Sequence, residues 1–499
     1  MTANLAHILT DSVDRYADRP AVKLGEASMT YAQLDGAVAR CAGMLRRLEV
    51  QAGDRVGIML PNVPYFPIVY YAILRVGGIV VPMNVLLKGR ETSFYLTDSG
   101  AKAIFAWMGF ADAAKVGAEA AGAELVVVTP GEFEKALAAE EPVTETVDRD
   151  GSDTAVILYT SGTTGTPKGA ELTHANMYTN ATITADTLAK ATAEDRFLGA
   201  LPLFHSFGQT CSMNVAVYTG AMLSLLPKFT AKECLEIIQR DKITILLGVP
   251  TMYVGLVHFP AAKEYDTSSL RLCISGGSAL PVEVIKAFES TFDAVLLEGY
   301  GLSETSPVAS FNHPDRERKA GSIGTPIAGV EMRLADDEGN EVGPGEIGEI
   351  CIRGHNVMRG YWQNPEATAS VMKDGWFATG DMATLDEEGY YFIVDRKKDM
   401  IIRAGYNVYP REIEEVLYEH PAVAEAAVIG TPHAEFGEEV AAVVVLKDGA
   451  TATPEELRDH VKAQVAAYKY PRRVILIEEL PHGPTGKILK REITVPNGS

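Results

Sequence analysis

The stretch Tyr159-Thr-Ser-Gly-Thr-Thr-Gly-Thr-Pro-Lys-Gly169 decides how the rest of the sequence is interpreted. It follows an apolar run, residues 154–158, which predicts a buried strand, and it precedes residues 171–189, which are compatible with a helix. Glycines let the main chain approach a ligand closely, and Ser, Thr and Lys side chains donate hydrogen bonds to anionic oxygens. We therefore expect a phosphate-binding loop between a strand and a helix, with an ordinary Gly/Ser/Thr loop as the alternative. It is not a P-loop, because Pro167 stands where that motif needs glycine.

The size and composition of the chain limit its class and its partners. A chain of 499 residues is long for one core and predicts two or more domains. Its 47% hydrophobic and 22% charged residues are typical of a soluble globular protein. The net charge of −21 argues against nucleic acid or an anionic membrane as the main partner. Anionic ligands must therefore be bound by local lysines and arginines.

The cysteines and the apolar segments indicate a cytoplasmic location. Five scattered cysteines without a CxxC pair suit a reducing compartment and no structural zinc. Residues 1–7 lack the basic and then apolar pattern of an export signal. Arg75, Gly77-Gly78 and Pro82 interrupt the most apolar stretch, residues 65–87, so a transmembrane segment is not expected.

The order of apolar runs predicts an α/β fold. Strand-like runs alternate with helical segments over residues 21–129 and 221–297, which favours βαβ units and mostly parallel sheets. Residues 132–150 are polar and acidic, and we interpret them as a connector. Glycine-rich turns separate short β runs over residues 321–361, which predicts a small antiparallel sheet or β-barrel.

A compact α+β unit is predicted from Asp395 onward. The expected architecture is thus a large N-terminal domain, residues 1–394, and a small C-terminal domain, residues 395–499. The large domain would contain layered, mostly parallel sheets with helices and the small barrel. The small domain is expected to be mobile.

Two turns after predicted strands carry candidate ligand groups. In Ser275-Gly-Gly-Ser-Ala-Leu280, adjacent glycines leave a flat floor for a base or a ribose, although a simple turn with Ser278 as a helix cap is equally open. In Gly299-Tyr-Gly-Leu-Ser-Glu-Thr305, Tyr300 is placed to stack on a planar ring. Ser303 and Glu304 of the same turn would face a phosphate or its metal.

Three further charged groups stand beside glycine turns. Asp381, in Thr379-Gly-Asp381, suits the hydroxyls of a ribose, and Arg396 would add charge-assisted hydrogen bonds. Near the C-terminus, Pro481-His-Gly-Pro-Thr-Gly-Lys-Ile488 places Lys487 on a loop that can bring its charge to a reaction centre. Each of these groups alone is also compatible with a turn or a salt bridge.

Taken together, these motifs resemble the adenylate-forming superfamily, which contains acyl-CoA synthetases, aryl-CoA ligases, luciferases and peptide-synthetase adenylation domains. The resemblance covers nearly the whole chain, keeps the motif order, and is greatest to fatty-acyl-CoA ligases. The matching segments are Tyr159–Gly169, Leu201-Pro-Leu-Phe-His-Ser-Phe-Gly208, Gly299–Thr305, Gly321–Pro326, Thr379–Asp381, Asp395–Pro410 and Pro484–Lys487.

The resemblance implies a role for each matching residue. The ATP-binding residues would be Thr160, Ser161, Gly162, Thr163, Thr164, Gly165, Lys168, Gly276, Gly277, Ser278, Glu298, Gly299, Tyr300, Gly301, Ser303, Asp381 and Arg396. The catalytic residues would be Lys487, Glu304 as the Mg²⁺ ligand, and His205. The acyl pocket would contain His205, Ser206, Val249, Gly276 and Gly299, and the CoA tunnel Lys398, Arg403 and Gly405. Asp395 would be the hinge, and Ser303 replaces the commoner threonine while keeping the hydroxyl.

The implied reaction is ATP-dependent activation of a medium- or long-chain fatty acid to acyl-AMP, with loss of pyrophosphate, and transfer of the acyl group to coenzyme A. ATP, Mg²⁺ and CoA are the implied cofactors and co-substrates. An aryl-CoA ligase, a stand-alone acyl-AMP ligase that loads a carrier protein, and a non-catalytic nucleotide-binding scaffold are the alternatives. Free CoA is favoured because no carrier domain follows Lys487. A monomer and a homodimer are both compatible with the sequence.

Overall fold

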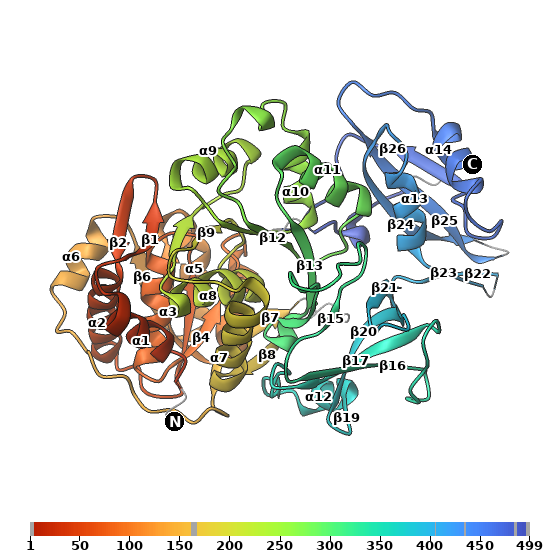
Figure 1. Ribbon diagram of the computed structural model, residues 1–499. Helices are drawn as coiled ribbons and strands as arrows, with labels where there is room; N and C mark the ends of the chain where they lie inside the picture. Colours follow the sequence, from red (N-terminus) through yellow and green to blue (C-terminus); the bar gives the residue numbers. More distant parts are fainter. Residues whose placement is uncertain (1–3, 161–166, 405, 434–435, 484–486, 496–499) are drawn as a thin grey trace.

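The computed structural model describes residues 4–160, 167–404, 406–433, 436–483 and 487–495. Figure 1 shows a large body that contains the strands up to β21 (Tyr391–Arg396) and a smaller unit at the C-terminal end, coloured blue. The smaller unit has its own buried apolar cluster, which includes Ile401, Ile413, Val428, Val444 and Leu457. The buried cluster of the large body extends to Tyr391 and that of the smaller unit begins at Ile401, and a domain boundary at Asp395 stays a prediction.

The strand that leads into the glycine-rich stretch lies in a mostly parallel sheet. The strands of this sheet are β3 (Arg55–Met59), β4 (Ile79–Pro82), β5 (Ala101–Trp107), β6 (Glu124–Val128), β7 (Thr154–Thr160), β8 (Lys168–Thr173) and β18 (Gly360–Tyr361). Their order is β18-β8-β7-β4-β3-β5-β6, and β8 and β18 are antiparallel additions at one edge. The first residues of β7 are buried, as expected for a parallel strand covered on both faces.

A second sheet carries the other turns predicted to bind nucleotide. It is formed by β1 (Pro20–Leu24), β2 (Ala27–Thr30), β9 (Arg196–Gly199), β10 (Met222–Leu225), β11 (Ile245–Gly248), β12 (Leu272–Ser275), β13 (Leu296–Gly301), β14 (Val308–Phe311) and β15 (Thr325–Pro326). The order is β15-β14-β13-β12-β11-β9-β10-β1-β2. Strands β1 and β9 to β13 run parallel, so the turns after β12 and β13 lie at the same sheet edge.

Two antiparallel sheets complete the fold. The glycine-rich segment forms β16 (Val330–Ala335), β17 (Gly348–Gly354), β19 (Met372–Lys373), β20 (Trp376–Leu385) and β21. The C-terminal unit contains β22 (Ile401–Arg403), β23 (Tyr406–Val408), β24 (Val423–His433), β25 (Gly437–Leu446) and β26 (Arg473–Leu476), of which β26 runs parallel to β25.

Helices cover the sheets and form most of the connections. The α-helices are α1 (His7–Tyr16), α2 (Tyr31–Arg47), α3 (Tyr65–Arg75), α4 (Gly89–Ser99), α5 (Ala111–Ala121), α6 (Glu132–Ala138), α7 (His174–Ile183), α8 (Val215–Thr219), α9 (Ala231–Asp241), α10 (Pro250–His258), α11 (Val282–Phe292), α12 (Pro365–Val371), α13 (Pro410–Tyr418) and α14 (Pro454–Lys462). Short 3-10 turns are η1 (Met108–Phe110), η4 (Ala262–Glu264), η5 (Ser303–Thr305) and η6 (Lys490–Glu492), and π-helices are η2 (Thr184–Ala189) and η3 (Phe207–Asn214).

Two local predictions were wrong. Residues 171–173 are not the start of the predicted helix but the end of strand β8 (Lys168–Thr173), which pairs antiparallel with β7, and helix α7 begins at His174, after Thr173, whose side chain accepts a hydrogen bond from the Asn176 N–H. The predicted phosphate-binding stretch therefore stands between two strands of a hairpin. The predicted connector contains helix α6, which forms because Phe133 and Leu137 are four residues apart and both bury their side chains.

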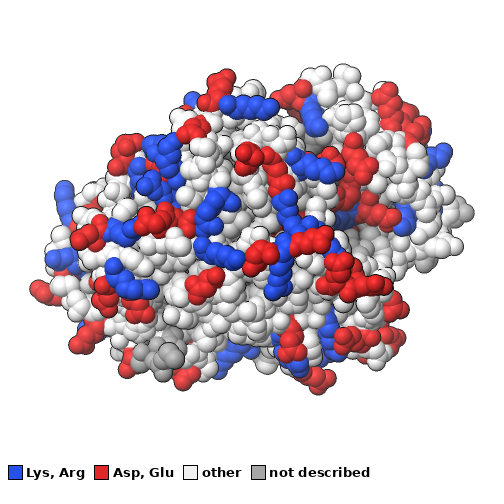
Figure 2. All heavy atoms as spheres, in the orientation of Figure 1, with Lys and Arg blue, Asp and Glu red and all other residues white. Residues whose placement is uncertain are grey.

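The five cysteines are buried with free thiols, in agreement with the absence of a CxxC pair. Among the described residues, no helix is both long and apolar enough to cross a membrane. Figure 2 shows acidic and basic side chains interspersed over the face in view, so the net charge of −21 is not gathered there into one acidic patch.

Candidate functional site

The predicted metal ligand Glu304 has a buried carboxylate. It belongs to η5, directly after β13, and its Oε1 accepts a hydrogen bond of 3.0 Å from the Tyr361 hydroxyl. The hydroxyl of Thr160, at the end of β7, lies 3.5 Å from the same oxygen. Burial raises the pKa of Glu304, although these hydrogen bonds and the charge of Arg396 oppose the rise. The structure thus brings together two residues, Thr160 and Glu304, that the sequence placed in separate motifs.

Tyr361 is a site residue that the sequence did not reveal. It lies on β18, whose pairing with β8 places it beside Ala170. The hydroxyl of Tyr361 donates to Glu304, and its ring lies under the ammonium of Lys168, with Nζ 5.3 Å from the ring centroid. A cation over an aromatic face is attracted by the ring quadrupole, so Tyr361 helps to orient Lys168. The Gly360-Tyr361 dipeptide gave no signal, since its place depends on a strand pairing between segments far apart in the chain.

The predicted phosphate loop is described only at its two ends. Thr160 and Lys168 face each other across the β7–β8 hairpin. Ser161, Gly162, Thr163, Thr164 and Gly165 lie outside the described residues, so their phosphate contacts stay predictions.

The predicted ribose-binding residues form a hydrogen-bonded cluster. Asp381 and Arg396 are directly opposed on β20 and β21, and the Arg396 Nε lies 3.2 Å from the Asp381 Oδ1. The hydroxyl of Tyr300 donates to the Asp381 Oδ2 over 2.7 Å. The carboxylate of Asp381 is buried, whereas Arg396 and Tyr300 are partly accessible. A carboxylate fixed by two donors in this way can accept hydrogen bonds from vicinal hydroxyls of a sugar.

The glycines predicted to bind adenine line the same sheet edge. Gly276 and Gly277 follow β12, Gly299 and Gly301 end β13, and a Cβ on Gly276 would lie 3.5 Å from the Gly299 oxygen. Ser278 is exposed on the turn after β12, and Ser303 is partly exposed in η5. The lack of a Cβ at Gly276 and Gly299 accommodates the Phe207 and Phe311 rings, and contact with adenine stays a prediction.

Glu298, which was also predicted to bind ATP, accepts hydrogen bonds from main-chain N–H groups. Its two carboxylate oxygens accept hydrogen bonds from the Leu280 N–H (3.4 Å) and the Gly321 N–H (3.2 Å). Burial raises its pKa to about 7, although the charge of Arg411 lowers it in part. Glu298 therefore fastens the turn after β12 to the segment before β15, and a direct contact with nucleotide stays a prediction.

The residues predicted for the acyl pocket lie around the start of the π-helix η3. The Phe207 ring is 3.1 Å from the position of a Cβ on Gly276, and the Val249 Cγ1 is 3.6 Å from that of a Cβ on Gly277. Ser206 is buried, and its hydroxyl has no hydrogen-bond partner among the described residues. Phe207 was not predicted, although it stands in the motif that contains His205. π-helices are rare and often mark functional sites, and Gly208 to Asn214 of η3 are all buried.

Lys487 reaches this site from the C-terminal unit. Burial, the charge of Arg396 and that of Lys398 lower the pKa of Lys487 to about 8, while Asp381 and Asp399 oppose the change. Burial and then the charge of Lys487 lower the pKa of His205 to about 4, so this imidazole is neutral at pH 7. The charge of Lys487 is thus felt both at the predicted ribose cluster and at His205 of the predicted acyl pocket.

The predicted hinge residue lies at the end of the large body, and the described residues predicted for the CoA tunnel follow it in the chain. Asp395 is the second-last residue of β21 and accepts a hydrogen bond of 3.0 Å from the Arg411 N–H at the start of α13. Lys398 is exposed. Arg403 forms a buried pair with Glu439, with Nε 2.6 Å from Oε1, so this guanidinium is held inside the C-terminal unit. Gly405 lies outside the described residues. The hinge and tunnel roles stay predictions.

Magnesium fits the oxygen donors at Glu304 and Thr160. Mg²⁺ prefers hard oxygen ligands and binds to proteins through one or two carboxylates, with water and substrate phosphates completing its shell. Among the described residues the buried Glu304 carboxylate forms no salt bridge, and its side-chain hydrogen-bond partners are the hydroxyls of Thr160 and Tyr361. A bound cation would compensate its charge.

Comparisons with known proteins agree with this arrangement. The family model described as AMP-binding enzyme matches residues 9–362, and the model of the AMP-binding enzyme C-terminal domain matches residues 412–487. The long-chain-fatty-acid–CoA ligase of Bacillus subtilis (strain 168) is 40% identical over 525 residues, covering 98% of this chain and 94% of the relative. Feruloyl-CoA synthase of Amycolatopsis sp is 39% identical over 476 residues, covering 95% of each chain.

A solved structure gives the same result for the fold. ATP-bound MatB from Rhodopseudomonas palustris has a TM-score of 0.92 and 36% identity, and the match covers 98% of each chain. The chain therefore belongs to the AMP-binding enzyme family of the adenylate-forming superfamily, and it is an acid–thiol ligase of the acyl-CoA synthetase type that uses ATP and coenzyme A.

Proposed function

We propose that the acid is a medium- or long-chain fatty acid, which is activated to acyl-AMP before transfer to CoA. The observation that carries the adenylation step is the electrostatic coupling of the Lys487 ammonium, from the C-terminal unit, to Arg396 and Asp381 and to His205 in the large body. The small or apolar character of Val249, Gly276 and Gly299 supports an aliphatic chain. The similarity to a long-chain-fatty-acid–CoA ligase supports the same class of acid.

Each side chain of the site would have a different role in adenylation. Asp381, Tyr300 and Arg396 would hold the ribose, so that the α-phosphate faces the bound carboxylate. Lys487 would stabilise the negative charge that grows on the phosphoryl oxygens, and it would do so strongly because the site is partly shielded from water. Magnesium at Glu304 would neutralise phosphate charge in the same step. His205 is neutral at pH 7. It would therefore not attract the carboxylate of the acid electrostatically.

Transfer to CoA requires a different arrangement. The thiol must reach the carbonyl carbon of the acyl-adenylate, where Lys487 is no longer needed. Rotation of the C-terminal unit about Asp395 would withdraw the ammonium and open a path for the thiol. Lys398, Arg403 and Gly405 are proposed to line that path.

An aryl acid is the second candidate, because Phe207 packs over Gly276 and feruloyl-CoA synthase is a relative at 39% identity. AMP release with CoA should be measured for acetate, octanoate, dodecanoate, hexadecanoate, benzoate and ferulate. We expect the highest kcat/KM for dodecanoate or hexadecanoate. Preference for ferulate or benzoate would assign the second candidate and overturn the first.

The lowered pKa of Lys487 predicts a pH dependence. The protonated ammonium is the form that stabilises phosphoryl charge, and it is lost as the pH rises through about 8. We expect kcat/KM for ATP in acid-dependent pyrophosphate exchange to fall above this pH, because this parameter reports groups of the free enzyme.

The matched variant for this profile is Lys487→Arg. Its guanidinium stays charged over the whole range, so the alkaline decline should disappear even if the absolute rate is lower. An unchanged decline in Lys487→Arg would show that another group titrates.

The buried carboxylate of Glu304 predicts a metal requirement. Glu304→Gln keeps an oxygen that can accept the Tyr361 hydrogen bond but removes the charge. We expect the Mg²⁺ concentration for half-maximal pyrophosphate exchange to rise at least roughly tenfold. Glu346→Gln, at an exposed turn, serves as the control. A magnesium titration of Glu304→Gln that coincides with the wild type would remove Glu304 from the ligand set.

A further inference from the structure

Lys487 lies on a short two-stranded arm. The residues of the candidate site described above do not account for what holds this arm in place. The arm consists of residues 481–483 and 487–489. The Leu489 N–H donates to the Pro481 oxygen and the Gly483 N–H donates to the Lys487 oxygen, both over 2.8 Å. His482 and Ile488 form an antiparallel bridge between the two segments. What holds this arm therefore decides where the ammonium of Lys487 lies.

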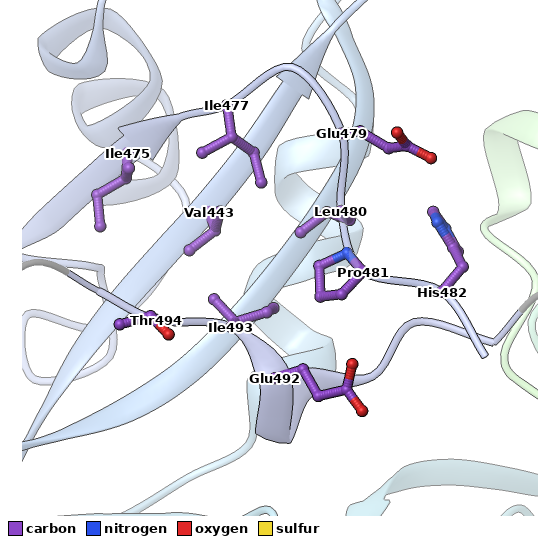
Figure 3. A pocket seen from close by; sticks show the side chains of 10 residues that line it. All are labelled: Val443, Ile475, Ile477, Glu479, Leu480, Pro481, His482, Glu492, Ile493 and Thr494. Carbon is purple, nitrogen blue, oxygen red and sulfur yellow. The ribbon is translucent and has the colours of Figure 1, made fainter. Parts of the chain in front are cut away.

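Apolar packing supports the base of the arm at Leu480 and one point within it, Ile488, which is partly buried against the same cluster. Leu480 is buried against Val443 of β25 and Ala427 of β24. Beyond it lies a hollow of about 530 Å³, and Figure 3 shows Pro481 and His482 on one side of this hollow and Glu492 and Ile493 on the other. Side-chain packing fixes position where atoms are in close contact, so it constrains the arm poorly over the hollow.

One ion pair and one histidine–carboxylate contact, which is an ion pair when the imidazole is protonated, link the two strands of the arm to the C-terminal unit. The Lys490 Nζ, one residue beyond the arm, lies 2.7 Å from the Glu414 Oε1 on helix α13. The same oxygen accepts a hydrogen bond of 2.7 Å from the Val428 N–H on β24. On the other strand, the His482 Nε2 lies 3.3 Å from the Glu425 Oε1. The Lys490 pair is the shorter one and joins the arm to both a helix and a strand.

The charge of Lys490 persists at neutral pH. Burial lowers its pKa, but the carboxylates of Glu414, Asp395 and Asp399 outweigh burial and raise it. Both side chains of the pair are largely buried, with 25% of Lys490 and 16% of Glu414 exposed. A shielded pair of this kind is less screened by salt than a surface pair, and it couples more strongly.

We propose that Lys490 is a positioning residue for adenylation, and that its ion pair with Glu414 holds the arm so that Lys487 reaches the α-phosphate. The His482–Glu425 pair secures the opposite strand of the arm. Lys490 touches no substrate in this role and acts only through the position of Lys487. The inference rests on the proposed adenylation reaction.

The test compares the two half-reactions in a set of variants. Adenylation is measured as pyrophosphate exchange with the best wild-type substrate among dodecanoate, hexadecanoate and ferulate. Thioester formation is measured separately, from the corresponding acyl-AMP supplied with CoA. Lys490→Ala removes the pair, Lys490→Arg keeps its charge, and Glu414→Gln removes the charge while keeping an acceptor for the Val428 N–H. Lys469→Ala is the matched control, because Lys469 pairs over 2.7 Å with Glu412 of the same helix α13 but not with the arm.

We expect Lys490→Ala and Glu414→Gln each to lower kcat of adenylation roughly 10- to 100-fold, the loss typical of an ångström-scale misplacement. The double variant should be no worse than either single variant, because both remove the same pair. Lys490→Arg should recover most of the rate, and Lys469→Ala should match the wild type. Thioester formation from acyl-AMP should persist in all of them.

Three results would overturn the inference while leaving the proposed function standing. They are wild-type adenylation in Lys490→Ala, an equal loss of both half-reactions, and additive losses in the double variant. Absence of exchange in the wild type would instead overturn the proposed function. Thermal unfolding of each variant separates a general loss of folding from misplacement of the arm.

Discussion

Replacing Lys487 by alanine is expected to lower acyl-adenylate formation roughly 100- to 1,000-fold, the range found when one preorganised charge-stabilising donor is removed from an active site. The ammonium lies within the field of Arg396 and Asp381, and burial lowers its pKa to about 8. Burial of the charged Lys487 ammonium and its repulsion by Arg396 both cost free energy. That cost is understandable if an anionic phosphate meets the ammonium during the reaction.

The control for Lys487→Ala is the second half-reaction. Thioester formation from supplied acyl-AMP and CoA should remain close to the wild-type rate, because the ammonium is withdrawn at that stage. Both rates can be measured on one preparation, by pyrophosphate exchange and by thioester release. An equal loss of both would contradict the assignment of Lys487 to the first step alone.

Replacing Gly301 by alanine is expected to disrupt both stability and nucleotide binding. A Cβ at this position would lie 1.8 Å from the Pro307 oxygen and 2.6 Å from its carbonyl carbon. Both are backbone atoms, so β13 and the segment that leads into β14 would have to separate. Overpacking of this kind costs about 3 kcal/mol or more. The separation would also displace Tyr300 and Glu304, which flank the turn.

The measurement for Gly301→Ala is thermal unfolding together with KM for ATP. We expect a clearly lower unfolding temperature and, in the fraction that folds, a KM raised by at least roughly tenfold. Gly36→Ala is the matched control, because Gly36 lies exposed in helix α2 with nothing within 4 Å of an added Cβ. That variant should be neutral or gain about 0.5–1 kcal/mol. Wild-type stability and KM in Gly301→Ala would show that the hairpin can widen without damage.

The sequence predicted individual candidate residues of the site better than the contacts between residues from distant segments. Asp381 and Arg396 were recognised from short motifs, and the β20–β21 register then placed them opposite each other. The approach of Lys487 to them was implied only by the family resemblance, since no local pattern tells where the arm of the C-terminal unit will lie. Tyr361 was missed for the same reason, because its contact with Glu304 depends on the pairing of β18 with β8.

The error at β8 has a local cause. Lys168–Thr173 is too short to show a periodicity, and the helical residues that follow made the whole segment resemble one helix. Its backbone pairs with β7 over the full strand, and this tertiary pairing outweighs local propensity. As a result, the segment that directly follows the glycine-rich stretch is a strand, and helix α7 begins only at His174.

We propose that this site joins a carboxylate to the α-phosphate of ATP and expels pyrophosphate before CoA takes part. The most direct test is exchange of labelled pyrophosphate into ATP, with Mg²⁺ and dodecanoate, hexadecanoate or ferulate, in the complete absence of CoA. The account predicts exchange that depends on the acid and is lost in Lys487→Ala. Acid-dependent AMP formation with CoA, but no exchange without it, would contradict an acyl-adenylate formed by this site.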